Sequence, residues 1–328
     1  MQHTNLFLLV GTTIIMKKKE RWPRNEALYN KVQETEFLHF FGYVNYLVNY
    51  VCKGRKMKSI IQCLLIWRKF PNLSVRRARG LLLLLRQFKI ISATIPCFKT
   101  LSNYNEHNSL QIILDQLIEE SSKPLSIIEN DFATDMTGIR TTLFSSWFSL
   151  RAKKTIERRD HLRDHITAGI KSMIVPAVNI LMKEGKDNII MREHVNKVHE
   201  NFSIHDWMGD TKYWCKKNCR EVKEKGGTPY FKCKTGKSAW NGKQDGYPSW
   251  KEMNTESNEH PRRYKKHYRF RVKVECTIHS KKALHGDKVY SRLPSARRNE
   301  ETLRWINHNI NVLNRARVEW NINPLSED

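Results

Sequence analysis

Four side chains able to bind phosphate or a cation recur at helical spacing in one segment of the chain. Tyr268, Arg271, Glu275 and Lys282 are separated by steps of three, four and seven residues. If the segment is an α-helix, each step nearly completes whole turns, so the four side chains share a stripe about 60° wide. The stripe would present a phenol, a guanidinium, a carboxylate and an ammonium group. Spacing alone favours a commoner interpretation, a solvated helix face with ion pairs one turn apart.

Two aspartates elsewhere in the chain have surroundings that suit chemistry on phosphate esters. Asp135 opens the block Asp-Met-Thr-Gly and closes a strand-like run that begins at Leu125. Asp210 lies in the block Gly-Asp-Thr-Lys-Tyr, after another short strand. Phosphodiester transfer uses two Mg²⁺ ions about 3.5–4 Å apart, and Mg²⁺ prefers oxygen ligands. Two aspartates at strand ends and Glu275 on a helix would supply such ligands if they converge.

Neighbouring acidic residues compete for these roles. Asp131 and Asp206 each lie four residues before one of the two aspartates, and Glu256 and Glu259 precede the glutamate. The two earlier glutamates lack the arginine and lysine companions of the later one. Asp187 is interpreted as an N-cap at the start of a helix.

The charge balance of the chain indicates a polyanionic partner. Its 328 residues include 58 lysines and arginines against 33 acidic residues, a net charge of +25. Such a surface attracts nucleic acid first and anionic lipid second. The sequence contains no apolar run of the ~20 residues needed to span a bilayer, and the short apolar stretch at 6–15 is a poor signal peptide.

The cysteine pattern favours a reducing compartment. The chain has seven cysteines. Their odd number and irregular spacing do not suit the disulfide framework of a secreted protein. Cys215, Cys219 and Cys233 hint at a zinc site, but no clean second pair follows them, so a metal-free interpretation is preferred.

Residues 1–100 are predicted to form a helical, basic N-terminal region. Apolar residues recur with a helical period over Met57–Lys69, and Ser74 suits the N-cap of a second helix that runs to about Phe88. Three arginines lie in the first turns of this second helix: Arg76, Arg77 and Arg79. A helix, a short loop and a basic helix would fit a DNA groove. The alternative is core packing with a basic rim, in which the apolar run Leu81–Leu85 is buried.

Residues 101–328 are predicted to form a mixed α/β catalytic domain. Strands are expected at 125–135, 165–170, 173–180 and 229–233, and helices at 187–200, 264–285 and 295–315. Residues 234–262 are rich in Gly, Lys, Asn, Ser and Pro and are expected to be a loop or insertion. Strands in the middle with helices around them imply an α/β or α+β fold.

Taken together, these blocks resemble the transposases of bacterial and archaeal insertion sequences. The pattern Tyr-x2-Arg-x3-Glu-x6-Lys at 268–282 matches the signature of a large group of these DDE enzymes. The block at Asp135 resembles their Asp-x-Thr-Gly, and the block at Asp210 resembles their Asp-x-x-Tyr. Further blocks resemble the following strand and the closing helix of these domains: Pro229–Lys232, Asn299-Glu300 and His308-Asn309. The resemblance covers about residues 75–315.

The resemblance implies a ribonuclease H-like domain in which Asp135, Asp210 and Glu275 hold two Mg²⁺ ions, for which Mn²⁺ can substitute. Such an enzyme hydrolyses the phosphodiester at the ends of its element, and the freed 3′-hydroxyl then attacks target DNA. The residues that would contact DNA phosphates beside the cut are Tyr268, Arg271 and Lys282. The implied partners are the terminal inverted repeats, the target DNA and a second copy of the chain, without a membrane, in the nucleoid-containing cytoplasm of a prokaryote.

Two other functions remain open at this level. A transposase relic that has lost cleavage would still be a basic DNA-binding protein or regulator. A high isoelectric point also suits an RNA-binding or ribosome-associated protein, but such a protein needs no set of carboxylates. Asp164 resembles a position in the second strand of the family, and a core role fits it equally well.

Overall fold

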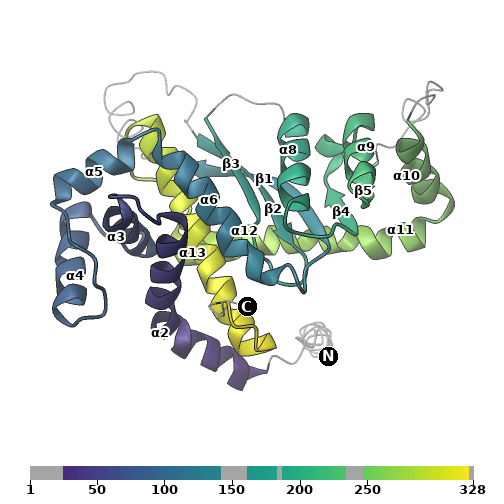
Figure 1. Cartoon of the computed structure of the whole chain (residues 1–328). Helices are drawn as coiled ribbons and strands as arrows, with labels where there is room; N and C mark the ends of the chain where they lie inside the picture. The colour runs from purple at the N-terminus through teal and green to yellow at the C-terminus, as the bar shows by residue number, and fades with distance from the viewer. Residues whose placement is uncertain (1–24, 142–160, 183–186, 234–246, 325–328) are drawn as a thin grey trace, which may run out of the picture.

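A computed structural model describes residues 25–141, 161–182, 187–233 and 247–324 (Figure 1). Its described residues form one five-stranded sheet in the order β3-β2-β1-β4-β5. The strands are β1 (Phe132–Arg140), β2 (His161–Gly169), β3 (Ala177–Leu181), β4 (Asp206–Gly209) and β5 (Thr228–Phe231). The first three strands pair antiparallel, whereas β4 and β5 run parallel to β1. The predicted mixed α/β class is therefore confirmed.

The central strand β1 separates two kinds of side chain by alternation. Successive residues of a strand point to opposite faces of the sheet. Phe132 packs in an apolar cluster with Trp207, whereas Ala133 belongs to the cluster on the other side. Asp135 lies on the same face of the sheet as Ala133, because the two are two residues apart.

Helices cover both faces of the sheet (Figure 1). The cluster around Phe132 is built with α8 (Asp187–His199), α9 (Lys216–Glu224), α10 (Pro248–Glu259) and α11 (Pro261–Tyr268). The cluster around Ala133 is built with α6 (Leu110–Ser122), α12 (Val272–His285) and α13 (Pro294–Trp320). Three short 3₁₀ segments join these elements: η1 (Lys123–Leu125), η2 (Thr211–Tyr213) and η4 (Arg269–Arg271).

Three N-terminal helices pack around α13: α2 (Glu26–Val51), α3 (Lys58–Lys69) and α5 (Phe98–Glu106). A further N-terminal helix, α4 (Val75–Gln87), packs against α3 and α5. Their buried residues, among them Leu47 and Leu64, belong to the same apolar cluster as Ala133 of the sheet. Thus the helical region continues directly into the core beside the sheet, and α13 lies between the two (Figure 1).

The first half of α13 is polar in sequence but buried. Arg304 forms ion pairs with Glu300 at 2.7 Å and with Glu301 at 3.3 Å, and Glu300 also pairs with Arg68 of α3 at 3.2 Å. Lys281 of α12 forms a fully buried ion pair with Glu301. Buried charges need such partners because leaving water is costly for them. This network joins α3, α12 and α13.

Several sequence predictions agree with the structure and others need correction. The two helices predicted after residue 57 are α3 and α4, and the Ser74 side chain caps α4 by accepting from the Arg77 amide. The strand predicted at 125–135 is wrong at both ends, because β1 runs from Phe132 to Arg140. Leu125, its predicted first residue, belongs to the 3₁₀ helix η1.

Two further corrections concern helices. The described part of the expected loop at 234–262 is α10 and the start of α11, stabilised by Trp250 and Met253, which pack in the apolar cluster of that face. Residues 234–246, like the apolar stretch at 6–15, lie outside the described residues. The leucine run of α4 is only partly buried, because Leu83 and Leu84 are exposed. No helix in the described ranges is long and apolar enough to cross a membrane.

Candidate active site

The parallel pairing of β1 with β4 brings two aspartates together. Thr134 of β1 is in register with Gly209, the last residue of β4. The next residues along the chain, Asp135 on β1 and Asp210 directly after β4, therefore lie side by side. One oxygen of Asp135 accepts from the Met136 amide at 2.9 Å, and one oxygen of Asp210 accepts from the Lys212 amide at 2.8 Å. The backbone amide therefore orients each carboxylate through one oxygen, and the second oxygen of each does not contact that amide.

A long helical segment brings the third carboxylate to the same place. The backbone is helical from α11 through η4 into α12, and Figure 1 shows α11 and α12 in line. Arg271 donates to Asp135 at 3.1 Å and also to Glu275 one turn later on the same helix. The polar stripe therefore contacts β1 through Arg271, and it also contains the ion pair one turn apart that spacing alone favours, with Glu275 exposed.

The distal end of the stripe contacts the block that follows Asp135. The Lys282 ammonium donates to the Thr137 hydroxyl at 2.7 Å and to the Gly138 carbonyl at 3.1 Å. Two motifs far apart in the sequence are thus in direct contact. Arg271 and Lys282 thus connect this helical segment to β1 at two points, and Val274 between them is buried in the core.

The electrostatics of the site show that its acids influence one another. Burial raises the pKa of Asp135, and the nearby charges of Asp210 and Glu275 act in the same direction, against the Met136 amide and Arg271. Burial also raises the pKa of Tyr268, which is hydrogen-bonded to Arg271. Negative charge thus accumulates at this point, and a cation placed there would relieve it.

The donor chemistry suits a divalent cation, but the arrangement of the side chains does not yet form a site for one. Asp135, Asp210 and Glu275 offer only oxygen ligands, as Mg²⁺ prefers. Over the described residues, however, no group of three histidine, cysteine or acidic side chains is arranged to hold a metal ion. The Arg271 guanidinium contacts both Asp135 and Glu275, so one oxygen of each carboxylate is engaged by a cationic side chain.

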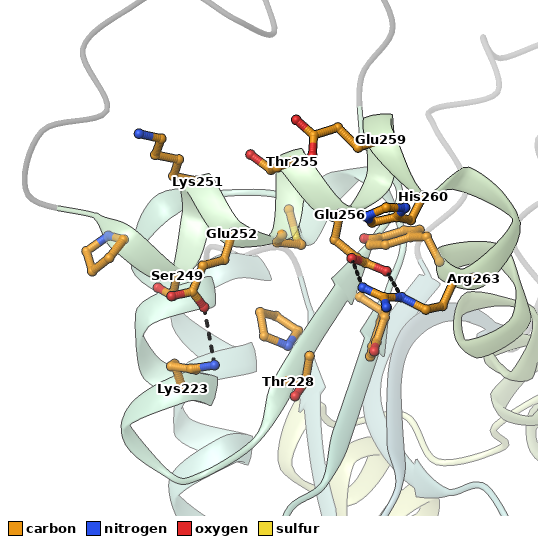
Figure 2. A pocket seen from close by; sticks show the side chains of 15 residues that line it. Lys223, Thr228, Ser249, Lys251, Glu252, Thr255, Glu256, Glu259, His260 and Arg263 are labelled. Carbon is orange, nitrogen blue, oxygen red and sulfur yellow. Dashed lines mark hydrogen bonds and ion pairs between the residues drawn. The ribbon is translucent and has the colours of Figure 1, made fainter.

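The competing acids have other partners. Asp131 accepts from the Asp206 amide at 3.1 Å, and Asp206 contacts the His267 ring at 2.6 Å, at the start of β4 and away from Asp210. Glu256 and Glu259 line a separate hollow of about 660 Å³ between β5, α9, α10 and α11 (Figure 2).

In that hollow, Glu256 pairs with Arg263, and Lys223 pairs with Glu252 at 3.2 Å. These two ion pairs join α10 to the neighbouring helices. Glu252 and Glu256 are therefore engaged by neighbouring helices, Glu259 is exposed, and all three belong to a different part of the fold from the three carboxylates.

The arginines of α4 differ in their surroundings. Arg76 is exposed and its guanidinium lies over the Phe98 ring at 4.5 Å. Arg77 is also exposed, whereas Arg79 donates to the Pro96 carbonyl at 3.2 Å. Arg76 and Arg77 are thus accessible to an anionic partner, and Arg79 fixes the segment that follows α4.

Sequence reasoning missed a polar chain behind the site. The Thr134 hydroxyl bonds Thr167 at 2.8 Å, Thr167 bonds His194 at 2.9 Å, and His194 bonds Asn179 at 3.0 Å. It joins β1, β2, β3 and α8 directly beneath the acids. In the sequence, the one local sign of this chain is the alternation of side chains along β2, which places Thr167 on the opposite face of the sheet from Asp164.

Asp164 has a core role. It is fully buried on β2 and accepts from the Trp305 indole at 2.9 Å. Burial raises the pKa of Asp164, and the nearby Lys281 and Lys282 oppose that effect. Asp187, predicted as a helix cap, starts α8 and contacts His165 at 3.1 Å. Cys219 is buried against Met253 at 3.7 Å, as expected for an apolar thiol.

No protein-family model matches the chain, and no curated protein or solved structure matches it significantly.

Proposed function

We propose that the chain is a DNA transposase that cleaves the ends of an insertion element and joins them to target DNA. The observation that carries the proposal is the convergence of Asp135, Asp210 and Glu275 from β1, β4 and α12, with Arg271 and Lys282 beside them. These residues lie far apart in the sequence, and a purely structural ion-pair network does not need three acids at one point.

We further propose that the sheet is a ribonuclease H-like core. Its support is the placement of the acids: the first on the central strand, the second directly after the adjacent parallel strand, and the third on α12, which packs against β1 and β2. The domain boundary near residue 100 stays a prediction.

The residues of the site divide into two groups. The three carboxylates would hold two Mg²⁺ or Mn²⁺ ions, which when bound activate the attacking water or hydroxyl and stabilise the leaving oxygen. Arg271 and Lys282 would grip phosphate oxygens beside the cut, the former by two parallel hydrogen bonds and the latter as a point charge. Tyr268 would add a hydrogen bond from its hydroxyl to a phosphate.

The proposed partner is DNA, bound by a homodimer that brings two element ends together. The net charge of +25 supports it, as do the exposed arginines of α4. This function belongs to the cytoplasm of a prokaryote, in association with the nucleoid.

A second candidate is a DNA-binding relic without cleavage. The observation that favours it is the ion pairing of Arg271 with Asp135 and Glu275, which occupies the carboxylates. A relic would bind DNA with the salt dependence of phosphate contacts but would not cut with any metal.

Nicking of supercoiled plasmid in Mg²⁺ or Mn²⁺ distinguishes the two. The parent protein should nick, and Asp135→Asn, Asp210→Asn and Glu275→Gln should bind DNA without nicking. Glu259→Gln is the matched control, because it neutralises an exposed acid of α10 away from the site. If the parent never nicks DNA that carries the element ends, the relic is the better description. If Glu259→Gln also loses nicking, the loss in the other three variants cannot be assigned to the three carboxylates.

A further inference from the structure

The position of Arg271 has a consequence for cation binding. Its guanidinium contacts Asp135 with one nitrogen at 3.1 Å and Glu275 with the other. The two contacts engage one oxygen of each carboxylate. A guanidinium and a divalent cation repel each other and need the same carboxylate oxygens, so they cannot occupy this point together.

Arg271 is also placed to leave this position. About a fifth of its side chain is exposed, and Glu275 is about half exposed, so solvent reaches the pair. The exposed contact with Glu275 contributes little to stability, whereas the contact with Asp135, whose side chain is only 17% exposed, is partly buried. The hydrophobic and hydrogen-bond anchors of the helix are elsewhere, in the buried Val274 and in Lys282. Releasing both contacts therefore needs a competing anion for the guanidinium, and it leaves the packing of Val274 in place.

A DNA phosphate is the ligand best able to draw Arg271 away. Guanidinium binds phosphate through two parallel hydrogen bonds, a geometry that its single contacts with Asp135 and Glu275 do not provide. Lys282, held by Thr137 on the same stripe, offers a second positive charge to the same backbone.

We propose that Arg271 is a displaceable counter-ion that keeps the carboxylates closed to divalent cations until DNA binds. In the free protein it neutralises Asp135 and Glu275. When a phosphate takes the guanidinium, the carboxylates become available and the cation binds. The inference rests on the proposed function, since it assumes that the three acids bind a cation at all.

Thermodynamic linkage makes the idea quantitative. If DNA raises the affinity for the cation by some factor, the cation must raise the affinity for DNA by the same factor. Removing Arg271 should abolish the coupling from both sides. The free Arg271→Gln variant should then bind the cation about as tightly as the DNA complex of the parent does.

The probe is Mn²⁺, whose free concentration is measured by its electron paramagnetic resonance signal without any need for activity. Free Arg271→Gln should bind Mn²⁺ at least about tenfold more tightly than the free parent, since a positive charge in contact with the site is removed. Arg269→Gln is the matched control: it removes an exposed charge two residues away and should change the affinity less than about threefold, because water screens it. Arg271→Lys keeps the positive charge but lacks the two-pronged guanidinium, so its Mn²⁺ affinity should lie between those of Arg271→Gln and Arg269→Gln. Circular dichroism of each variant establishes that it is folded.

The second measurement is DNA affinity by fluorescence anisotropy, with and without Mn²⁺, on a short synthetic duplex. The parent should bind the duplex more tightly in Mn²⁺, and Arg271→Gln should show no such gain. If folded Arg271→Gln or Arg271→Lys binds Mn²⁺ no more tightly than Arg269→Gln, the counter-ion role is refuted.

The failure of the inference differs from the failure of the proposed function. If the free parent binds Mn²⁺ as tightly as Arg271→Gln and Asp135→Asn abolishes this binding, the cation site stands and only the counter-ion role falls. If no variant binds Mn²⁺ with or without DNA, both proposals fall.

Discussion

Two adjacent lysines on α12 have opposite surroundings. Lys281 is fully buried against Glu301, whereas Lys282 reaches Thr137 at the edge of the candidate site. Helical spacing explains the difference, because neighbouring residues are about 100° apart and face different layers. The pair offers a test in which one substitution affects stability and the other affects function.

Lys281→Met should destabilise the protein by about 3 kcal/mol, because it leaves Glu301 with an incomplete set of partners in the interior. Lys282→Met removes two hydrogen bonds at a partly exposed position, so it should lower the denaturation midpoint much less than Lys281→Met, and it should reduce plasmid nicking. Urea denaturation followed by circular dichroism measures the first effect, and the nicking assay measures the second. Equal loss of stability in both variants would contradict this assignment.

The candidate site shows what residue types alone could and could not predict. The spacing of residues 268–282 predicted that their polar side chains share one helix face. It did not predict whether that face contacts the sheet or the solvent, since both have the same period. The closeness of Asp135 and Asp210 depends on the parallel pairing of two strands that are distant in the sequence, for which there is no local pattern. Only the resemblance to a family linked them before the structure did.

At the scale of elements, α4 offers exposed arginines to an anionic partner outside the site. Arg76 and Arg77 are exposed in its first turns, and Arg79 is engaged with Pro96. The three arginines therefore have different roles, although they look equivalent in the sequence.

The double variant Arg76→Gln/Arg77→Gln should weaken DNA binding and reduce its dependence on salt, because each lost phosphate contact lowers the slope of log K against log salt by about 0.9. Fluorescence anisotropy at several salt concentrations measures the slope. Lys197→Gln/Lys217→Gln removes the same charge from exposed positions on α8 and α9 and serves as the control. An equal change of slope in both double variants would argue against a specific role for α4.

Helices with one apolar face were predictable, and helices that depend on distant partners were not. The period of apolar residues was enough for α3 and the N-cap was enough for the start of α4. By contrast, α10 has a sequence typical of loops and is held by packing of Trp250 on Trp214, whose ring centroids are 4.6 Å apart. The polar start of α13 suggests a surface helix, yet its charges are buried because they neutralise one another.

For the whole molecule, buried histidines should make stability depend on pH. Burial lowers the pKa of His308 to about 4, and it lowers those of His194 and His285 well below the ordinary value. Between pH 6.5 and 4 the unfolded chain takes up a proton at position 308 that the folded chain does not. The free energy of unfolding must therefore fall as the pH falls through this window.

The substitution His308→Gln removes this proton uptake and keeps a donor for the Met173 carbonyl, which the ring contacts at 3.0 Å. The loss of stability between pH 7.5 and 5.5 should be smaller in the variant by about 1 kcal/mol. Urea denaturation at the two pH values measures it, with the exposed His279→Gln as control. Parallel pH profiles for the variant and the parent would show that His308 titrates equally in both states.

The burial of α13 between the N-terminal helices and the sheet also has a consequence for synthesis on the ribosome. The elements that carry Asp135, Asp210 and Glu275 are all translated before this helix, which supplies the shared packing surface for α2, α3 and α6. A nascent chain can pair its strands early, but its core stays incomplete until α13 leaves the exit tunnel. Ribosomes that stall or stop within the preceding segment would therefore release chains with exposed apolar helices, which are substrates for chaperones and proteases.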